Sequence, residues 1–137
     1  MAITGLEGVA LLVGRVLLGG VLAFMGLNHF MQPDGMAGYA EAKGVPFPRA
    51  AVLFSGGQLA FGGLLLAVGA YPVLAAGALA SFFVVVTPMM HDFWAVPDDQ
   101  VQDEMTGFLK NVGLLGASLL VLAIANREWA YAIGIGF

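Results

Sequence analysis

The sequence contains no cysteine among its 137 residues. Disulfide exchange, iron–sulfur ligation and thiolate zinc sites all need cysteine sulfur, so the composition excludes these chemistries for this chain. Basic residues are also scarce, because five Lys and Arg stand against nine Asp and Glu and give a net charge of −4. No basic patch is available for a phosphate backbone, and we expect no nucleic-acid partner.

Charge of either sign is rare, and apolar residues dominate instead. Charged residues make up 10% of the chain and hydrophobic residues 60%, with a mean hydropathy of +0.91. A soluble domain carries about a quarter charged residues, so most of this surface cannot face water. The composition predicts a multi-pass protein of the cell membrane, whose first partner is the lipid bilayer.

Turn-forming residues divide the chain into four apolar runs of span length. A bilayer span needs roughly 20 apolar residues, and we predict spans at about 6–30, 50–69, 73–90 and 105–125 in a single transmembrane domain. The predicted fold is therefore all-α, an integral membrane four-helix bundle with up-down-up-down topology. The termini and the Tyr71–Pro72 turn then share one side, and the connections 31–49 and 91–104 share the other. We expect a short interfacial helix within 35–43. The many glycines permit either internal helix packing or a homo-oligomer.

Two polar residues fall deep within the predicted spans. Arg15 lies roughly 13 Å into the first span at the rise of an α-helix, and it either snorkels toward the interface or faces the interior to pair with a polar group. We favour the interior. Gln58 lies near the middle of the second span and must find a partner. Its amide either makes an interhelical hydrogen bond or contacts a ligand or Arg15.

Two histidines end spans at the same predicted face, and Asn28 precedes the first of them. His29 and His91 fit structural or capping roles, proton transfer or a hydrogen bond to a quinone carbonyl, or axial ligation of a haem. No spacing motif supports a metal ion, so we predict no metal site. Haem is the weaker cofactor hypothesis and quinone the stronger.

The stretch 87–111 gathers seven titratable groups between two long hydrophobic runs, which are His91, Asp92, Asp98, Asp99, Asp103, Glu104 and Lys110. Asp98 and Asp99 are predicted to cap the last span, whose acidic first turn suits the helix dipole. Trp94 is expected to anchor at the membrane interface, and Asp92 lies beside His91. Lys110 lies about 7 Å into the last span next to Asn111, which suggests a polar cavity or a headgroup contact. An acid of the loop or a histidine is the expected partner of Lys110.

Several segments together resemble the DoxX-like family of small four-span membrane proteins. They are GRVLLGGVLAFMGLNHF in the first span, GVPFP before the second, SGGQLAFGGLLLAVG within it, and HDFW after the third. The resemblance covers essentially the whole chain, and the acidic loop is similar to that of members from halophilic archaea. It implies a helical bundle linked to membrane redox or sulfur metabolism, with relatives that include a subunit of a thiosulfate–quinone oxidoreductase. The family often has glutamate where this chain has Gln58, so a role that needs a carboxylate there is in doubt.

Three functional hypotheses follow. The first is a redox-linked protein, either quinone-interacting or an accessory subunit of a membrane oxidoreductase, with a soluble or membrane redox partner. In this hypothesis a histidine supplies the proton, and Arg15 or Lys110 stabilises negative charge on the reduced quinone. The second is a non-catalytic subunit that recruits a soluble partner through the acidic loop, and the third is a lipid-binding or transport protein. The residues predicted to line the ligand site are Arg15, Asn28, His29, Gln58, His91, Asp92, Trp94, Lys110 and Asn111.

Overall fold

The chain is all-α, as its composition predicts. The computed structural model describes residues 1–137 and contains five α-helices. Four are long, and the short one lies between the first two long helices. The helices are α1 (Gly5–Met31), α2 (Pro33–Ala42), α3 (Pro48–Val68), α4 (Pro72–Met90) and α5 (Val101–Ala123).

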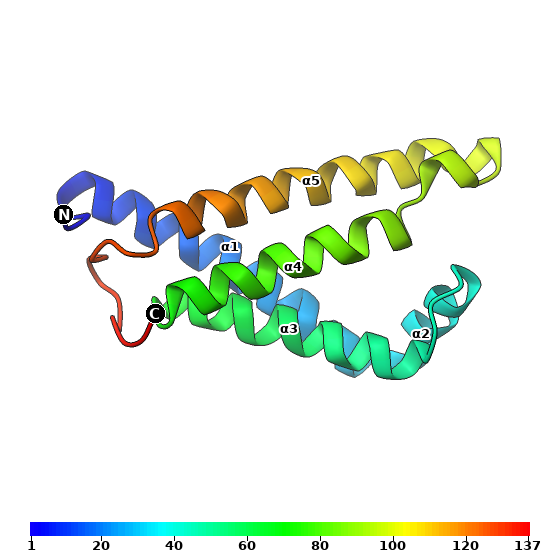
Figure 1. Cartoon of the computed structure of the whole chain (residues 1–137), viewed down its shortest axis with the longest axis horizontal. Helices are drawn as coiled ribbons and strands as arrows, with labels where there is room; N and C mark the ends of the chain where they lie inside the picture. Colours follow the sequence, from blue (N-terminus) through cyan, green and yellow to red (C-terminus); the bar gives the residue numbers. More distant parts are fainter.

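The long helices form an up-down-up-down bundle (Figure 1). Helix α1 packs mainly against α3, α3 against α4, and α4 against α5. Both chain ends and the α3–α4 turn lie at one end of the bundle, which we call the termini face. Helix α2 and the α4–α5 connection lie at the opposite end, which we call the loop face. The predicted bundle topology is confirmed.

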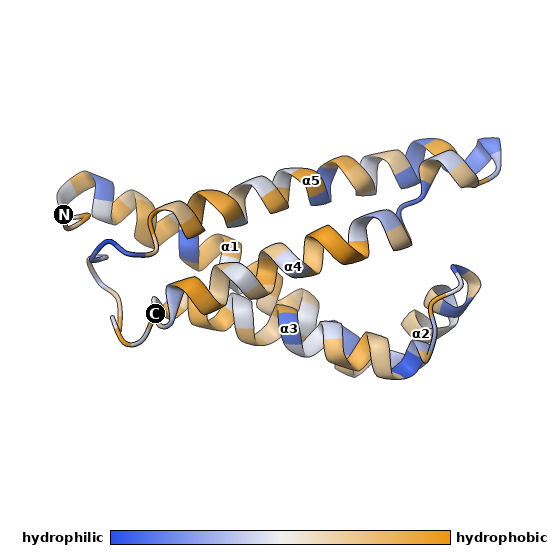
Figure 2. Ribbon diagram, in the orientation of Figure 1, coloured by the Kyte–Doolittle hydropathy of each residue, from blue (hydrophilic) through white to orange (hydrophobic).

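Apolar side chains cover the outside of the bundle as well as its core. All four long helices are long and apolar enough to cross a membrane, and Figure 2 shows that the polar residues concentrate in the connections. Large apolar side chains such as Phe24, Phe54, Phe61 and Leu120 are exposed on the surface. A water-soluble monomer rarely exposes this much contiguous apolar surface. The exposed belt is therefore the surface that faces lipid.

Helices α1 and α3 approach each other at two glycine pairs. A methyl group on Gly63 would lie 2.5 Å from the carbonyl oxygen of Gly19, and one on Gly26 would lie 2.5 Å from that of Gly56. The two pairs are seven residues apart on each helix, so both lie on the same helix face. Glycine lets the two backbones come into direct contact, which is the usual way that membrane helices pack tightly.

Arg15 faces the interior of the bundle near the termini face. Its side chain is 2% exposed, and its guanidinium donates to the carbonyl oxygens of Tyr131 and Ala130. The guanidinium carbon also lies 5.9 Å from the centre of the Trp129 ring. The C-terminal segment after α5 therefore folds over this end of the bundle and satisfies part of the buried cation.

The loop face contains the short helix that the turn-rich connection predicts within 35–43. It is α2, which begins at Pro33 and ends at Ala42.

The predicted capping of the last helix by Asp98 or Asp99 is wrong. These residues form a 3₁₀ turn with Gln100, and α5 begins at Val101 without a side-chain capping bond. The turn already aligns the backbone with the helix that follows it.

The glycine contact predicts opposite effects at two adjacent positions of α1. Gly19→Ala places a methyl group against the backbone of α3, which we expect to cost about 1–3 kcal/mol. A methyl group on Gly20 meets nothing within 4 Å, so Gly20→Ala is expected to be neutral or slightly stabilising. Thermal unfolding of both variants in detergent measures the difference. Equal melting temperatures would contradict the backbone contact.

Candidate functional site

A cavity of about 550 Å³, which we call the pocket, lies near the loop face between α3 and α4. Fourteen of its 20 lining residues are hydrophobic. Four of the chain's seven methionines line it, which are Met25, Met36, Met89 and Met90. Small-molecule sites are usually cavities of about 300–1,000 Å³ with apolar walls and a few placed polar groups. The pocket has this character.

The pocket opens sideways, toward the surface that faces lipid. Phe54 of α3 and Val85 of α4 both line it, and they are 75% and 55% exposed. They belong to the apolar belt of the two helices, so the gap between them leads into the hydrocarbon layer. A ligand dissolved in the membrane can enter without crossing the aqueous phase.

Gln58 lies in the pocket wall and connects α3 to α4. Its amide nitrogen donates to the carbonyl oxygen of Ala78 at 2.9 Å and to the Ser81 hydroxyl at 2.7 Å. The interhelical hydrogen bond that we considered for this residue is therefore present, and Gln58 does not contact Arg15. Its amide oxygen accepts no hydrogen bond within the protein. A ligand hydroxyl in the pocket can donate to it.

His29 presents a second unused acceptor. Its Nδ1 atom lies 2.8 Å from the carbonyl oxygen of Met25. A carbonyl only accepts, so Nδ1 carries the proton and the Nε2 atom of the neutral ring keeps its lone pair. The ring also packs edge-on against Phe82, with 6.4 Å between ring centres. His29 is thus held in one orientation on the pocket wall.

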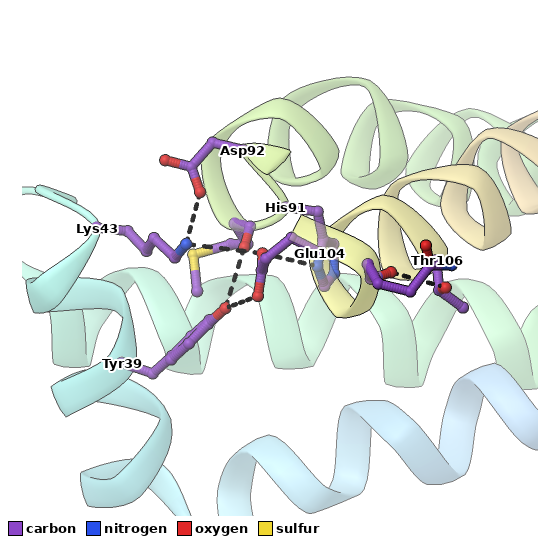
Figure 3. Close-up of polar contacts among 8 residues, drawn as sticks. Tyr39, Lys43, His91, Asp92, Glu104 and Thr106 are labelled. Carbon is purple, nitrogen blue, oxygen red and sulfur yellow. Dashed lines mark hydrogen bonds and ion pairs between the residues drawn. The ribbon is translucent and has the colours of Figure 1, made fainter. Parts of the chain in front are cut away.

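Five polar residues that we call the loop-face network close the pocket at the membrane surface (Figure 3). From α2, Tyr39 donates to the Glu104 carboxylate at 2.7 Å and Lys43 lies 2.5 Å from the Asp92 carboxylate. Lys43 is also 3.6 Å from Glu104, and the fifth member is His91. Tyr39 and His91 line the pocket as well. The network therefore holds α2 in place over the pocket.

His91 and Glu104 face each other where the network meets the pocket. His91 Nδ1 lies 3.5 Å from Glu104 Oε2. Both atoms are buried, and neither has a hydrogen-bond partner in the protein. A proton on His91 would convert this contact into an ion pair.

The environment of the network shifts two pKa values upward. Burial raises the pKa of the Tyr39 phenol above its ordinary 10.0, and the hydrogen bond to Glu104 adds to this shift. Burial opposes the charged form of Lys43, but the hydrogen bond to Asp92 and the nearby charge of Glu104 raise its pKa above the ordinary 10.5. Tyr39 therefore remains a hydrogen-bond donor, and Lys43 a cation, at neutral pH.

The structure brings only some of the predicted ligand-lining residues together. His29, Gln58, His91 and Asn111 line the pocket, and Asp92 lies beside it in the loop-face network. The other four predicted residues do not line it, namely Arg15, Asn28, Trp94 and Lys110.

Each of these residues has a different position. Arg15 lies at the opposite end of the bundle, against the C-terminal segment. Lys110 is exposed and makes no ion pair, so the expected contact with an acid of the loop or a histidine is absent. Trp94 is exposed and packs against the rings of Phe93 and Phe108. Asn28 is half-buried. Arg15 and Lys110 thus contribute no charge to the pocket wall.

Sequence reasoning missed three residues of the network. Tyr39 reads as an interfacial aromatic residue, Lys43 as a loop charge, and Glu104 as part of an acidic first turn. Their contacts join residues 49 to 65 positions apart, and they form only when α2 folds back over α4 and α5. The one available signal is the gathering of opposite charges in the two connections of the same face.

No group of three His, Asp or Glu residues gathers to hold a metal ion.

Comparison with known families agrees with this architecture. Residues 10–92, more than half of the chain, match the DoxX family. The chain belongs to the DoxX family. The matched segment of this DoxX protein contains every pocket residue except Asn111. Glu104 of the network also lies outside it.

A curated bacterial protein is similar over most of its length. Inner membrane protein YphA of Escherichia coli strain K12 is 28% identical over 114 residues, which cover 82% of this DoxX chain and 81% of the relative. No solved structure matches the chain. Together with the four apolar helices, these findings establish a multi-pass membrane protein in contact with the lipid bilayer.

The contacts of Lys43 in the loop-face network predict that this residue holds α2 in place. Lys43→Gln leaves the Asp92 and Glu104 carboxylates without their cation, at an expected cost of about 1–3 kcal/mol, between the values for exposed and buried pairs. The chain has no native cysteine, so spin labels at Glu41→Cys and Gln102→Cys report the α2–α5 distance specifically. We expect a broader and longer distance distribution. Lys110→Gln, which removes an unpaired lysine, is the control, and equal distributions in both variants would contradict the role of Lys43.

The raised pKa values also predict alkaline release of α2. A group whose pKa is raised in the docked state stabilises docking fully below its ordinary pKa and loses this contribution as the pH rises through the raised value. Docking should therefore persist at neutral pH and weaken once the pH passes 10.5, the ordinary pKa of lysine. The same label pair measures this transition, and circular dichroism checks that the helices remain folded. Release that begins near neutral pH would contradict it.

Proposed function

We propose that this DoxX-family protein binds a lipid-soluble quinone, or its reduced quinol form, in the pocket as part of a membrane redox system. The observation that carries the proposal is an apolar cavity, open to lipid, with two unused acceptors on its wall. These are Nε2 of His29 and the amide oxygen of Gln58. The two hydroxyls of a quinol donate to acceptors of this kind.

The charge of the pocket favours a neutral headgroup. No Lys or Arg lines the cavity. A phosphate in an apolar environment needs a cation or several donors to offset its desolvation. Lys43 is turned to Asp92 and Arg15 lies at the other end of the bundle. A neutral ring with hydroxyl or carbonyl groups is therefore a better ligand than a phospholipid headgroup.

The titratable residues suit the protons of the reaction. Oxidation of a quinol releases two protons and two electrons, and the free ring nitrogen of His29 offers an acceptor for a proton from a hydroxyl. His91 and Glu104 offer a second acceptor between the pocket and the loop face. The side chains provide no centre for the electrons, so these require a redox partner protein. This assigns the chain the role of a quinone-binding or accessory subunit.

The alternative functions make different predictions about what accompanies the purified protein. Asp98 and Asp99 are exposed and form no ion pair, so they are free for a basic soluble partner. Under that hypothesis a protein copurifies and quinone does not. Under the lipid hypothesis a defined phospholipid is retained.

The proposal predicts that Gln58 contributes to ligand affinity. Gln58→Leu removes the acceptor and two interhelical hydrogen bonds of about 0.6 kcal/mol each, so the fold is expected to survive while quinone affinity falls about tenfold. Titration of a tail-less benzoquinone and its quinol into the protein in nanodiscs measures the affinity, and mass spectrometry of the organic extract measures retained quinone. Gln32→Leu, which replaces an exposed amide outside the pocket, is the control. Unchanged affinity in Gln58→Leu, or no binding to the wild type, would refute the proposal.

A further inference from the structure

A second hollow, which we call the tail groove, runs along the outside of α3 and α4. Its volume is about 460 Å³, and Gln58 is its one polar lining residue. Glycine and alanine leave it open, because Gly57, Gly62 and Ala78 carry no side chain large enough to fill it. The residues that line it are Leu53, Phe54, Gly57, Gln58, Phe61, Gly62, Leu65, Leu74 and Ala78.

The tail groove continues the pocket. Phe54 and Gln58 line both. Along α3, the pocket residues begin at Ala51 near the loop face and the groove extends to Leu65 near the termini face. Helix α4 runs antiparallel to α3, and its groove residues precede its pocket residues in the chain. The lining residues of α4 therefore also place the groove nearer the termini face than the pocket. The two hollows therefore adjoin each other along the same two helices, overlapping over residues 53–59 of α3, and the groove alone continues toward the termini face.

Gln58 marks the junction between them. Its amide is fixed to α4 by the hydrogen bonds to Ala78 and Ser81. Ser81 lines the pocket and Ala78 lines the tail groove. The pocket side of this junction holds the polar groups, and the other side is apolar. Such a division matches a molecule with a polar head and a hydrocarbon tail.

The direction of the groove matches the direction of lipid chains. Leu53 and Leu65 are twelve residues apart on α3, which corresponds to roughly 18 Å along the helix axis. The hydrocarbon core of a bilayer is about 30 Å thick, so the groove covers more than half of it. A tail that leaves the pocket beside Gln58 would run along the groove, parallel to its lipid neighbours.

We propose that the ligand carries one long isoprenoid tail, and that this tail lies in the tail groove while the quinone ring occupies the pocket. The inference rests on the proposed function and specifies its ligand class. A phospholipid chain could enter an apolar groove of this kind from the membrane. The continuity at Gln58, and the absence of a cation in the adjoining pocket, favour the tail of a neutral ligand.

The test compares one benzoquinone ring without a tail and with a short isoprenoid tail. Wild-type protein in nanodiscs should bind the tailed form about tenfold more tightly, or better, because the groove shields the added hydrocarbon. Phe61→Ala removes a groove side chain that is 71% exposed, and Ala78→Leu enlarges a residue that lines the groove. Both variants should lose most of the increase in affinity that the tail provides and keep the affinity for the tail-less ring. Thermal unfolding checks their fold.

Phe24→Ala is the matched control, because Phe24 is 60% exposed on α1 and lines neither hollow. Partition of the tailed quinone into lipid is the same for every variant and cancels in the comparison. If the gain in affinity from the tail is equal in Phe24→Ala, Phe61→Ala and Ala78→Leu, the groove does not hold the tail, although the pocket still binds the ring. If Ala78→Leu loses only a retained phospholipid, the groove holds membrane lipid and the inference is overturned. If no variant binds the tail-less ring, the proposed function itself fails.

Discussion

The contact between the glycines of α1 and α3 is the constraint on which the site depends. Because Gly19 and Gly26 lie directly against Gly63 and Gly56, the two helices have one distance and one register. The register places the side chain of His29 immediately above Gly56, where any larger residue would displace it. Packing that is usually explained as membrane-helix association thus also fixes the position of the His29 ring on the pocket wall.

The remaining interactions close the two ends of the bundle and leave its side open. At the termini face, the C-terminal segment covers Arg15. At the loop face, the charges on Lys43, Asp92 and Glu104 fasten α2. Between α3 and α4 no comparable seal exists, and the side chain of Gln58 provides the polar link between them. A protein that is closed at both aqueous ends and open to lipid is suited to a ligand that is dissolved in the membrane.

The fold was predictable because lipid leaves the backbone few alternatives. A segment without water must satisfy its own hydrogen bonds, so apolar runs separated by proline and glycine can be assigned as helices. The site was less predictable, for reasons visible in single residues. Arg15 and His29 are fourteen positions apart on α1, roughly 21 Å at the helical rise, so the first could not share a pocket with the second. Lys110 and Asn111 are neighbours but point about 100° apart, and only the packing of α5 decides that Asn111 faces inward. Contacts such as that of Tyr39 with Glu104 form only in the tertiary fold, so no local sequence pattern predicts them.

The distribution of polar groups along the bundle also bears on transport. The buried cation lies near the termini face, the two histidines lie toward the loop face, and Gln58 lies near the middle of α3. Between these regions the interior is filled by Leu22, Leu59, Leu66, Leu79 and Phe83, all essentially inaccessible to solvent. An ion or polar solute crossing the bundle would have to pass this apolar layer without a partner, at a cost of several kcal/mol for a charge. The interior therefore favours a site near one face that opens to the surrounding lipid over a path from one side of the membrane to the other.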